Sequence, residues 1–137
     1  MKVVLTGHKG FIGSHYYDYI KNHHEVITYD LANGHDLKDK AVTDSMPDCD
    51  VVVHMAATNS TRLFYEKPTE VSFNNTLPTF NLIERYKNTN TKFVFTSTCE
   101  IFNGAIDKGL YPVPTDENVP VMFDNITNPR WSYSIPK

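Results

Sequence analysis

Tyr133 and Lys137 are spaced as Tyr-x-x-x-Lys, and their side chains could together move a proton. Residues four apart lie about one turn apart on a helix, so this spacing puts both side chains on one helical face. A phenol has a pKa of about 10, and a nearby ammonium group is predicted to lower that pKa. A tyrosine adjusted in this way can take the proton of a hydroxyl group while a hydride leaves the adjoining carbon.

A second candidate site lies near the N-terminus, where Gly7, Gly10 and Gly13 follow an apolar run at three-residue intervals. The first glycine permits a tight turn, the second lets the backbone approach a pyrophosphate, and the third allows close packing of helix on strand. The helix that begins there supplies N–H donors and the positive end of its dipole. Placed after an N-terminal strand, this pattern predicts a dinucleotide site.

Two charged residues bear on which dinucleotide would bind. Asp30 closes the second apolar run, 17 residues after Gly13. A carboxylate there accepts hydrogen bonds from the adenosine ribose hydroxyls of NAD and repels the 2′-phosphate of NADP. Lys9 indicates the opposite, because a cation in the glycine loop can pair with that phosphate. We expect NAD, with an NADP-dependent enzyme as the alternative.

Alternating apolar strands and helical segments must position these residues. We expect strands at 2–6, 25–29, 50–54 and 92–97, helices at 11–22 and 69–86, and a short helix or turn at 36–45. Pro78 should kink the helix at 69–86 or remove one of its hydrogen bonds. Residues 104–130 read as a long loop, and a final helical turn begins near Ser132. The pattern predicts an α/β fold, a Rossmann-like doubly wound parallel sheet with strand order 3-2-1-4. The sheet is truncated, because a complete one has about six strands.

The bulk composition restricts the class of protein. A chain of 137 residues with a net charge of -3 is one domain, spanning 1–137, without a basic field for nucleic acid or an anionic membrane. It has no apolar run of membrane-spanning length and no signal peptide. Cys49, Cys99 and the six histidines show neither disulfide nor metal-ligand spacing. We therefore expect a cytoplasmic protein with reduced thiols and no metal.

Six segments, in the correct order, resemble those of the extended short-chain dehydrogenases of the NAD-dependent epimerase/dehydratase family, which act on nucleotide sugars. They are residues 6–14, 36–37, 54–57, 74–82, 95–102 and 133–137. The resemblance runs from residue 2 to residue 137 and corresponds to the cofactor-binding N-terminal part of that family's fold. It implies NAD as the cofactor and a nucleotide sugar as the substrate.

The resemblance also implies roles for particular residues. Tyr133 would be the catalytic base, Thr98 would orient the reacting oxygen, and Glu100 would act as an acid or base. Lys137 would assist Tyr133 and hold the nicotinamide ribose. The implied cofactor-binding residues are Gly7, Lys9, Gly10, Phe11, Ile12, Gly13, Asp30, Asp36, Leu37, Met55, Ala56, Ala57, Asn75 and Lys137.

The residues after Thr98 bear on the reaction that follows hydride transfer. The resemblance implies that a dehydratase carries an acidic pair there, and this chain has Cys99 and Glu100. A thiol, with a pKa of about 8.5, is a poor acid for protonating a leaving hydroxyl group. This favours an epimerase over a dehydratase and leaves a decarboxylase open.

No residue follows Lys137, so we expect the sugar-nucleotide domain of this family to be absent and turnover by the chain alone to be weak or nil. Two alternatives stay open. The chain could be a non-catalytic dinucleotide-binding module that is completed by self-association, as a homo-oligomer, or by a partner. It could also be an NADP-dependent keto-sugar reductase, which Lys9 would favour.

Overall fold

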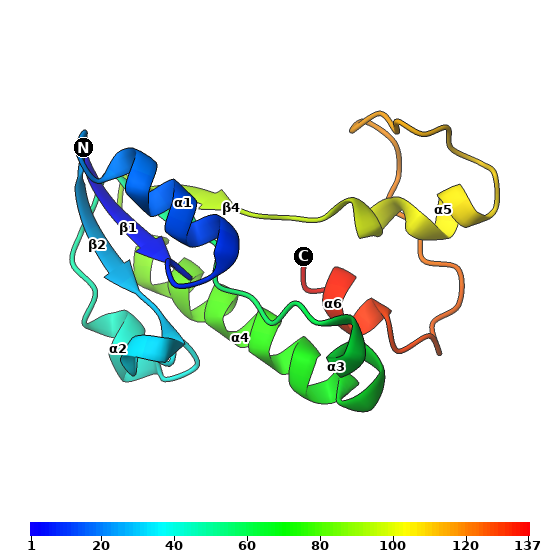
Figure 1. The fold of residues 1–137 in the computed structure, drawn as a ribbon, viewed down its shortest axis with the longest axis horizontal. Helices are drawn as coiled ribbons and strands as arrows, with labels where there is room; N and C mark the ends of the chain where they lie inside the picture. The colour runs from blue at the N-terminus through cyan, green and yellow to red at the C-terminus, as the bar shows by residue number, and fades with distance from the viewer. The chain divides into compact units, whose positions relative to one another are not determined.

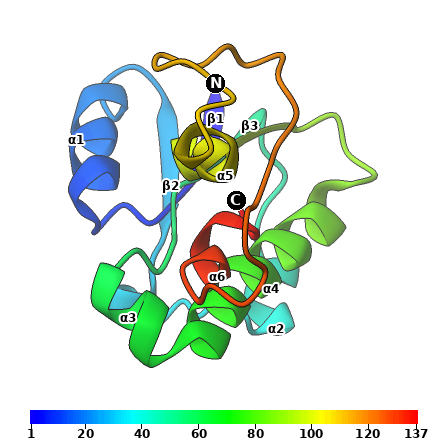
Figure 2. The same ribbon diagram turned by 90° about the vertical axis from the view of Figure 1, so that its right-hand side faces the viewer.

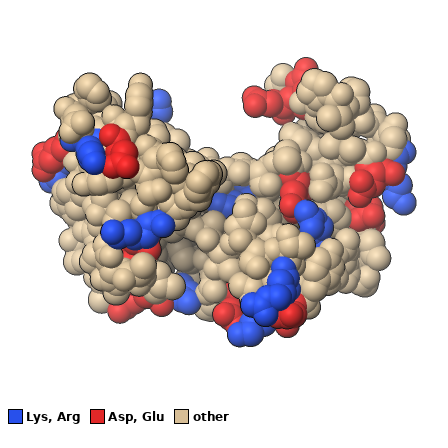
Figure 3. Space-filling model, viewed as in Figure 1, with Lys and Arg blue, Asp and Glu red and all other residues tan.

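The computed structural model describes residues 1–137, which form two compact units. The first, called here the sheet unit, comprises Met1–Thr58 and Asn74–Thr96. The second, called the tyrosine unit, comprises Asn59–Phe73 and Ser97–Lys137. None of the helices has both the length and the apolar character needed to cross a membrane. Acidic and basic side chains are interspersed on the face shown in Figure 3, so neither sign dominates it.

The sheet unit contains four parallel strands, β1 (Lys2–Thr6), β2 (Glu25–Tyr29), β3 (Val51–His54) and β4 (Lys92–Phe95), in the order β2-β1-β3-β4 (Figure 1). The predicted class, a truncated Rossmann-like parallel sheet with flanking helices, is confirmed. The predicted order 3-2-1-4 is wrong in one respect, because it places the third strand beside the second. Residue Thr6 of β1 instead pairs with Tyr29 of β2 on one side and with His54 of β3 on the other.

Burial explains this strand order. Three consecutive valines make β3 apolar on both faces, as an inner strand requires, and Val52 and Val53 are buried. In contrast, β2 carries Glu25 and Thr28 and is only partly buried, as suits an edge. Apolar periodicity reports burial but not which neighbour a parallel strand pairs with, so the periodicity alone did not give the order.

Helices cover both faces of the sheet (Figure 2). On one face α1 (Phe11–Ile20) packs Ile20 against Val3, Leu5 and Val53. On the other face α4 (Pro68–Tyr86) packs Leu82 and Tyr86 against Val4 and Val52 of the strands, together with Leu37 and Met46. Two short elements complete this unit, η1 (Leu31–Asn33) and α2 (Lys40–Asp44).

Two helical segments are shorter than their predicted bounds. The first helix ends at Ile20, two residues before the predicted end. The segment 36–45, predicted as a short helix or turn, is helical only in α2, because the Asp39 side chain accepts a hydrogen bond from the Ala41 N–H and caps the helix there. Helix α4 continues through Pro78, whose missing N–H removes one backbone hydrogen bond, as predicted.

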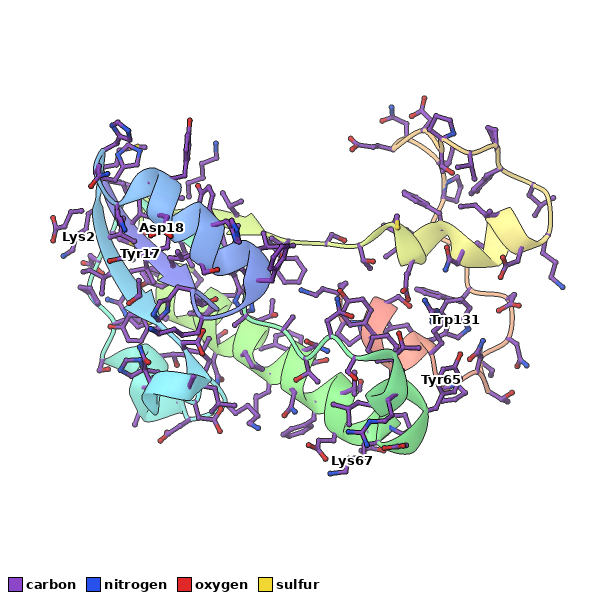
Figure 4. The ribbon with its side chains drawn as sticks, viewed as in Figure 1. Lys2, Tyr17, Asp18, Tyr65, Lys67 and Trp131 are labelled. Atoms are coloured by element: carbon purple, nitrogen blue, oxygen red, sulfur yellow. The ribbon has the colours of Figure 1, made fainter.

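The tyrosine unit is built from short helices and a loop. Its elements are α3 (Thr61–Glu66), η2 (Cys99–Phe102), α5 (Asn103–Asp107) and α6 (Trp131–Ser134). The loop predicted over 104–130 therefore begins later, at 108, while the predicted last turn near Ser132 is confirmed as α6. The indole of Trp131, labelled in Figure 4, donates to the Asn125 carbonyl oxygen at 2.9 Å and packs edge-on against Phe123. These contacts attach the loop to α6.

Candidate functional site

A cavity of about 260 Å³ lies at the carboxyl ends of β1, β2 and β3 in the sheet unit. The chain leaves β1 toward β2 on one side and later returns to β3 on the other, so the cavity lies at the topological switch point of the sheet. Ligands of open α/β sheets bind at this point. The cavity is lined by Gly7, Gly10, Asp30, Leu31, His35, Asp36, Leu37, Lys38, Met55, Ala56, Ala57, Thr58, Asn74 and Pro78.

The glycine loop has the close packing that its spacing predicts. Gly7 has a φ of 78°, and a Cβ atom there would lie 2.5 Å from the Ala56 nitrogen. A Cβ atom on Gly13 would collide with the Gly7 carbonyl oxygen, so this glycine lets α1 start directly against the loop. Gly10 caps α1 without any side chain, which leaves the first-turn N–H groups as donors for an anion.

The Asp30 carboxylate connects the glycine loop to the end of β2. Its Oδ2 accepts the backbone N–H of Lys9 at 2.8 Å, and its Oδ1 accepts the N–H of Ala32 at 3.0 Å. Each carboxylate oxygen can accept a second hydrogen bond, so Asp30 can still receive ribose hydroxyls. The Lys9 side chain is exposed and does not line the cavity.

Most of the other predicted cofactor-binding residues line this cavity. Asp36 and Leu37 do so, and Asp36 Oδ1 accepts the Lys38 N–H at 3.0 Å. Residues 55–57 also line the cavity. Phe11 and Ile12 do not line the cavity, since their side chains are 83% and 70% exposed, and they can contribute only backbone N–H groups.

Asn75 lies behind the cavity wall, although its neighbour Asn74 lines the cavity. The Asn75 side chain is buried and bonds twice to the backbone of Thr58: Oδ1 accepts the N–H at 2.8 Å, and Nδ2 donates to the carbonyl oxygen at 3.1 Å. The structure thus shows Asn75 supporting the segment 55–58 that follows β3.

The predicted catalytic residues all lie in the tyrosine unit, whereas the residues that line the cavity all lie in the sheet unit. The Tyr133 ring is buried and stacks on Phe64 with a centroid separation of 4.9 Å. Burial raises the pKa of Tyr133, and the charges of Glu100 and Cys99 raise it further, while a hydrogen bond with Thr98 lowers it. These contacts bring Tyr133, Thr98 and Glu100 together.

The direction of the Tyr133 pKa shift is opposite to the predicted one. Burial and the Glu100 carboxylate both disfavour the charged phenolate, so the phenol ionises less readily than in water. Burial also lowers the pKa of Lys137, so its ammonium group loses its proton more readily than in water. The carbonyl oxygen of Lys137 accepts the Ser97 hydroxyl at 2.9 Å.

Arg130 is a residue of this group that the sequence analysis missed. Its Nη2 atom lies 2.6 Å from Glu100 Oε1. The signal in the sequence is a cation three residues before Tyr133, which is nearly one helical turn. The sequence spacing alone does not show that Arg130 pairs with Glu100, which lies 30 residues away in the chain.

The chain is similar to several known proteins. A sequence model of the NAD dependent epimerase/dehydratase family matches residues 3–137. A protein of Methanocaldococcus jannaschii with the provisional name UDP-glucose 4-epimerase is 31% identical over 153 residues, covering 98% of this chain and 47% of the relative. A UDP-N-acetyl-alpha-D-glucosaminuronate decarboxylase of Bacillus cytotoxicus is 27% identical over 155 residues, covering 99% of this chain and 46% of the relative.

Among solved structures, a crystal structure of a UDP-galactose 4-epimerase superposes with a TM-score of 0.78 at 29% identity, covering 99% of this chain and 48% of that one. The chain spans about half the length of the curated relatives it matches. The family match nonetheless includes both the residues of the cavity and the group around Tyr133. The chain therefore belongs to the NAD dependent epimerase/dehydratase family.

Proposed function

We propose that the chain is the NAD-binding part of a nucleotide-sugar epimerase or related oxidoreductase. The observation that carries the proposal is the cavity at the switch point, where the glycine loop and Asp30 meet. These residues fit a dinucleotide, because the uncapped N-terminus of α1 suits a pyrophosphate and the carboxylate suits the ribose of NAD. NAD supplies a hydride acceptor when it is bound.

The predicted cofactor-binding residues would share the binding of NAD. Asp30 would accept the ribose hydroxyls, while Gly7, Gly10 and Gly13 with the N–H groups of Phe11 and Ile12 would receive the pyrophosphate. The remaining binding residues of this proposal, with Asn75 acting through Thr58, are Lys9, Asp36, Leu37, Met55, Ala56, Ala57 and Lys137.

The residues of the tyrosine unit would handle the proton. Tyr133 would take it from a sugar hydroxyl, and Thr98 would orient the reacting oxygen. Because burial and Glu100 raise the pKa of Tyr133, the phenolate forms on the alkaline side, and we expect turnover to increase with pH. Cys99 at the position where a dehydratase would carry an acid favours epimerisation over loss of water.

The two curated relatives carry UDP-sugars in their names, which supports a nucleotide sugar as the substrate class. Each relative is about twice as long as this chain. We propose that these 137 residues bind the dinucleotide and turn over a nucleotide sugar weakly or not at all by themselves.

Calorimetric titration of the chain with NAD and, separately, with NADP tests this function. We expect saturable NAD binding that is tighter than NADP binding. D30A should weaken NAD binding at least about tenfold, since a hydrogen bond to a charged group contributes roughly 1.5–3 kcal/mol. D18A, which changes an exposed aspartate of α1, is the matched control and should bind like wild type. Tighter NADP binding that D30A leaves unchanged would favour the keto-sugar reductase, and binding of neither would refute both readings.

A second candidate is a non-catalytic dinucleotide-binding module that self-associates. Strand β4 is an edge of the sheet, and its Val94 side chain is 38% exposed. An apolar edge strand can pair with another chain. Native mass spectrometry distinguishes the candidates: a dimer that V94K converts to a monomer supports self-association through this edge, whereas a monomeric wild type refutes it.

A further inference from the structure

Arg130 and Glu100 form a close ion pair beside the Tyr133 ring in the tyrosine unit. The Arg130 Nη2 to Glu100 Oε1 distance is 2.6 Å, and the two side chains are 30% and 16% exposed. A charge-assisted hydrogen bond at this distance and degree of burial is stronger and better oriented than a surface ion pair. The pair therefore holds both side chains in a defined position within this unit.

Arg130 is itself held in place by its surroundings. Its guanidinium carbon lies 6.0 Å from the centre of the Phe64 ring, on which the Tyr133 ring is also stacked. Its backbone N–H donates to Asn128 Oδ1 at 3.1 Å, and its carbonyl oxygen accepts the Tyr133 N–H at 3.2 Å. Phe64 thus contacts both the base and the cation, so Arg130 and Tyr133 share one scaffold.

The second oxygen of Glu100 has a different environment. Oε2 is buried and accepts no hydrogen bond from the protein. A buried carboxylate oxygen without a donor is costly, and such an atom in a native structure calls for a functional explanation. Arg130 thus donates to one oxygen of the Glu100 carboxylate and leaves the other without a donor.

We infer that Arg130 is a positioning residue that acts through Glu100: it holds the carboxylate beside Tyr133 with Oε1 occupied and Oε2 presented as a hydrogen-bond acceptor. The inference rests on the proposed function, in which Tyr133 acts on a sugar hydroxyl. A carboxylate paired in this way receives a hydrogen bond from a substrate hydroxyl and does not supply a proton. The site then suits removal and return of hydrogen, and it provides no acid for expelling a hydroxyl group.

The ionisation of Tyr133 reports on this arrangement without any cofactor or sugar. The titratable groups whose charges reach Tyr133 are Glu100 and Cys99. We would label the tyrosines with ¹³C at Cζ, assign the Tyr133 signal with Y133F, and follow it by NMR as the pH rises. The variants are R130M, R130K, E100Q and the R130M/E100Q double variant. R62M, which breaks the exposed Arg62–Glu66 pair of α3, is the matched control.

We expect R130M to raise the pKa of Tyr133, because the Glu100 charge is then uncompensated. R130K should restore the wild-type behaviour in large part, and E100Q should lower the pKa. R130M should have little further effect in the E100Q background, and R62M should have none.

An equal effect of R130M with and without Glu100 would show that Arg130 acts directly on Tyr133, which overturns the inference. The Trp131 indole signal reports whether the unit is folded. If R130M loses that signal, E100Q and R130K decide the question, because an unchanged Tyr133 pKa in E100Q also overturns it. Failure to bind NAD would refute the proposed function but would not move this titration.

Discussion

At the scale of single residues, a buried chain of hydrogen bonds runs through His54 in the sheet unit. The Ala56 N–H donates to Thr6 Oγ1 at 3.2 Å, and Thr6 Oγ1 lies 2.7 Å from His54 Nδ1. His54 Nε2 lies 3.2 Å from Thr79 Oγ1, which in turn donates to the Asn75 carbonyl oxygen. Because the Thr79 proton is used there, Thr79 Oγ1 can accept a hydrogen bond from His54 Nε2. His54 thus links β1, β3 and α4.

We predict that T6V destabilises the protein by about 1–3 kcal/mol, because the valine keeps the shape of the side chain but removes the hydroxyl from this buried chain. The free energy of unfolding in urea measures the loss. T69V, which changes an exposed threonine of α4, is the matched control and should lie within about 0.5 kcal/mol of wild type. Equal stabilities of T6V and T69V would show that this chain of hydrogen bonds contributes nothing to stability.

At the scale of elements, the junction of β1 and α1 depends on two glycines for different reasons. A Cβ atom on Gly13 would collide with the backbone of the loop, whereas one on Gly10 would lie 3.3 Å from the Gly7 carbonyl oxygen, a distance that small shifts can relieve. Gly13 therefore controls packing, and Gly10 controls the surface that faces the cavity.

We predict that G13A lowers the free energy of unfolding by about 1–3 kcal/mol through overpacking and abolishes dinucleotide binding with it. G10A should keep most of the stability and still weaken NAD binding, because its methyl group occupies the approach to the pyrophosphate. Urea unfolding and calorimetry on both variants separate the two effects. Equal destabilisation by G10A and G13A would contradict this division.

The segment after β3 is a second case in which one element positions another. N75D should destabilise the sheet unit by about 1–3 kcal/mol, because an aspartate can accept the Thr58 N–H but cannot donate to the Thr58 carbonyl oxygen. NAD binding should weaken in parallel, since residues 55–57 line the cavity. In the control N74D, the carboxylate still accepts from Lys38, so stability should change little. Urea unfolding compares the two variants. An N75D variant as stable as N74D would show that the two Asn75–Thr58 hydrogen bonds do not stabilise this segment.

At the scale of the whole molecule, buried tyrosines make the free energy of unfolding fall at alkaline pH. Burial, and to a smaller extent the Cys49 thiol, raises the pKa of Tyr86 well above its ordinary value. The phenol donates to the Pro47 carbonyl oxygen at 3.0 Å. A group whose pKa is higher in the folded state contributes stability that is present below its unfolded pKa, about 10, and is lost as the pH rises further.

We predict that the free energy of unfolding falls steeply between about pH 9 and about pH 11, where the unfolded chain releases its tyrosine protons. Y86F should be less stable than wild type near neutral pH by about 1 kcal/mol, for lack of the hydrogen bond. Its stability should nonetheless fall less over the alkaline range. Y65F, which changes a tyrosine that is 54% exposed, should keep the wild-type pH dependence. Parallel urea profiles for wild type and Y86F would contradict the assignment.

The parts of the fold and site that could be predicted are those carried by local pattern. The four strands follow from apolar runs, the glycine loop from the spacing of its glycines, and the last helical turn from the residues that end the preceding loop. The structure has all of them close to where they were expected. The strand order was missed because apolar periodicity reports how buried a strand is but not which strand it pairs with. The behaviour of Tyr133 was missed because its pKa depends on burial and on Glu100, 33 residues away in the chain.

The sequence by itself determined the α/β class, the family resemblance and most residues of the cavity, because backbone turns and parallel strands follow from short-range chemistry. Only the tertiary structure decided which side of β1 receives β3, that Asn75 supports a loop, and that Arg130 pairs with Glu100. Each of these depends on which side chains meet across long stretches of chain. Burial and Coulomb interactions act through that spatial proximity, which one-dimensional spacing does not encode.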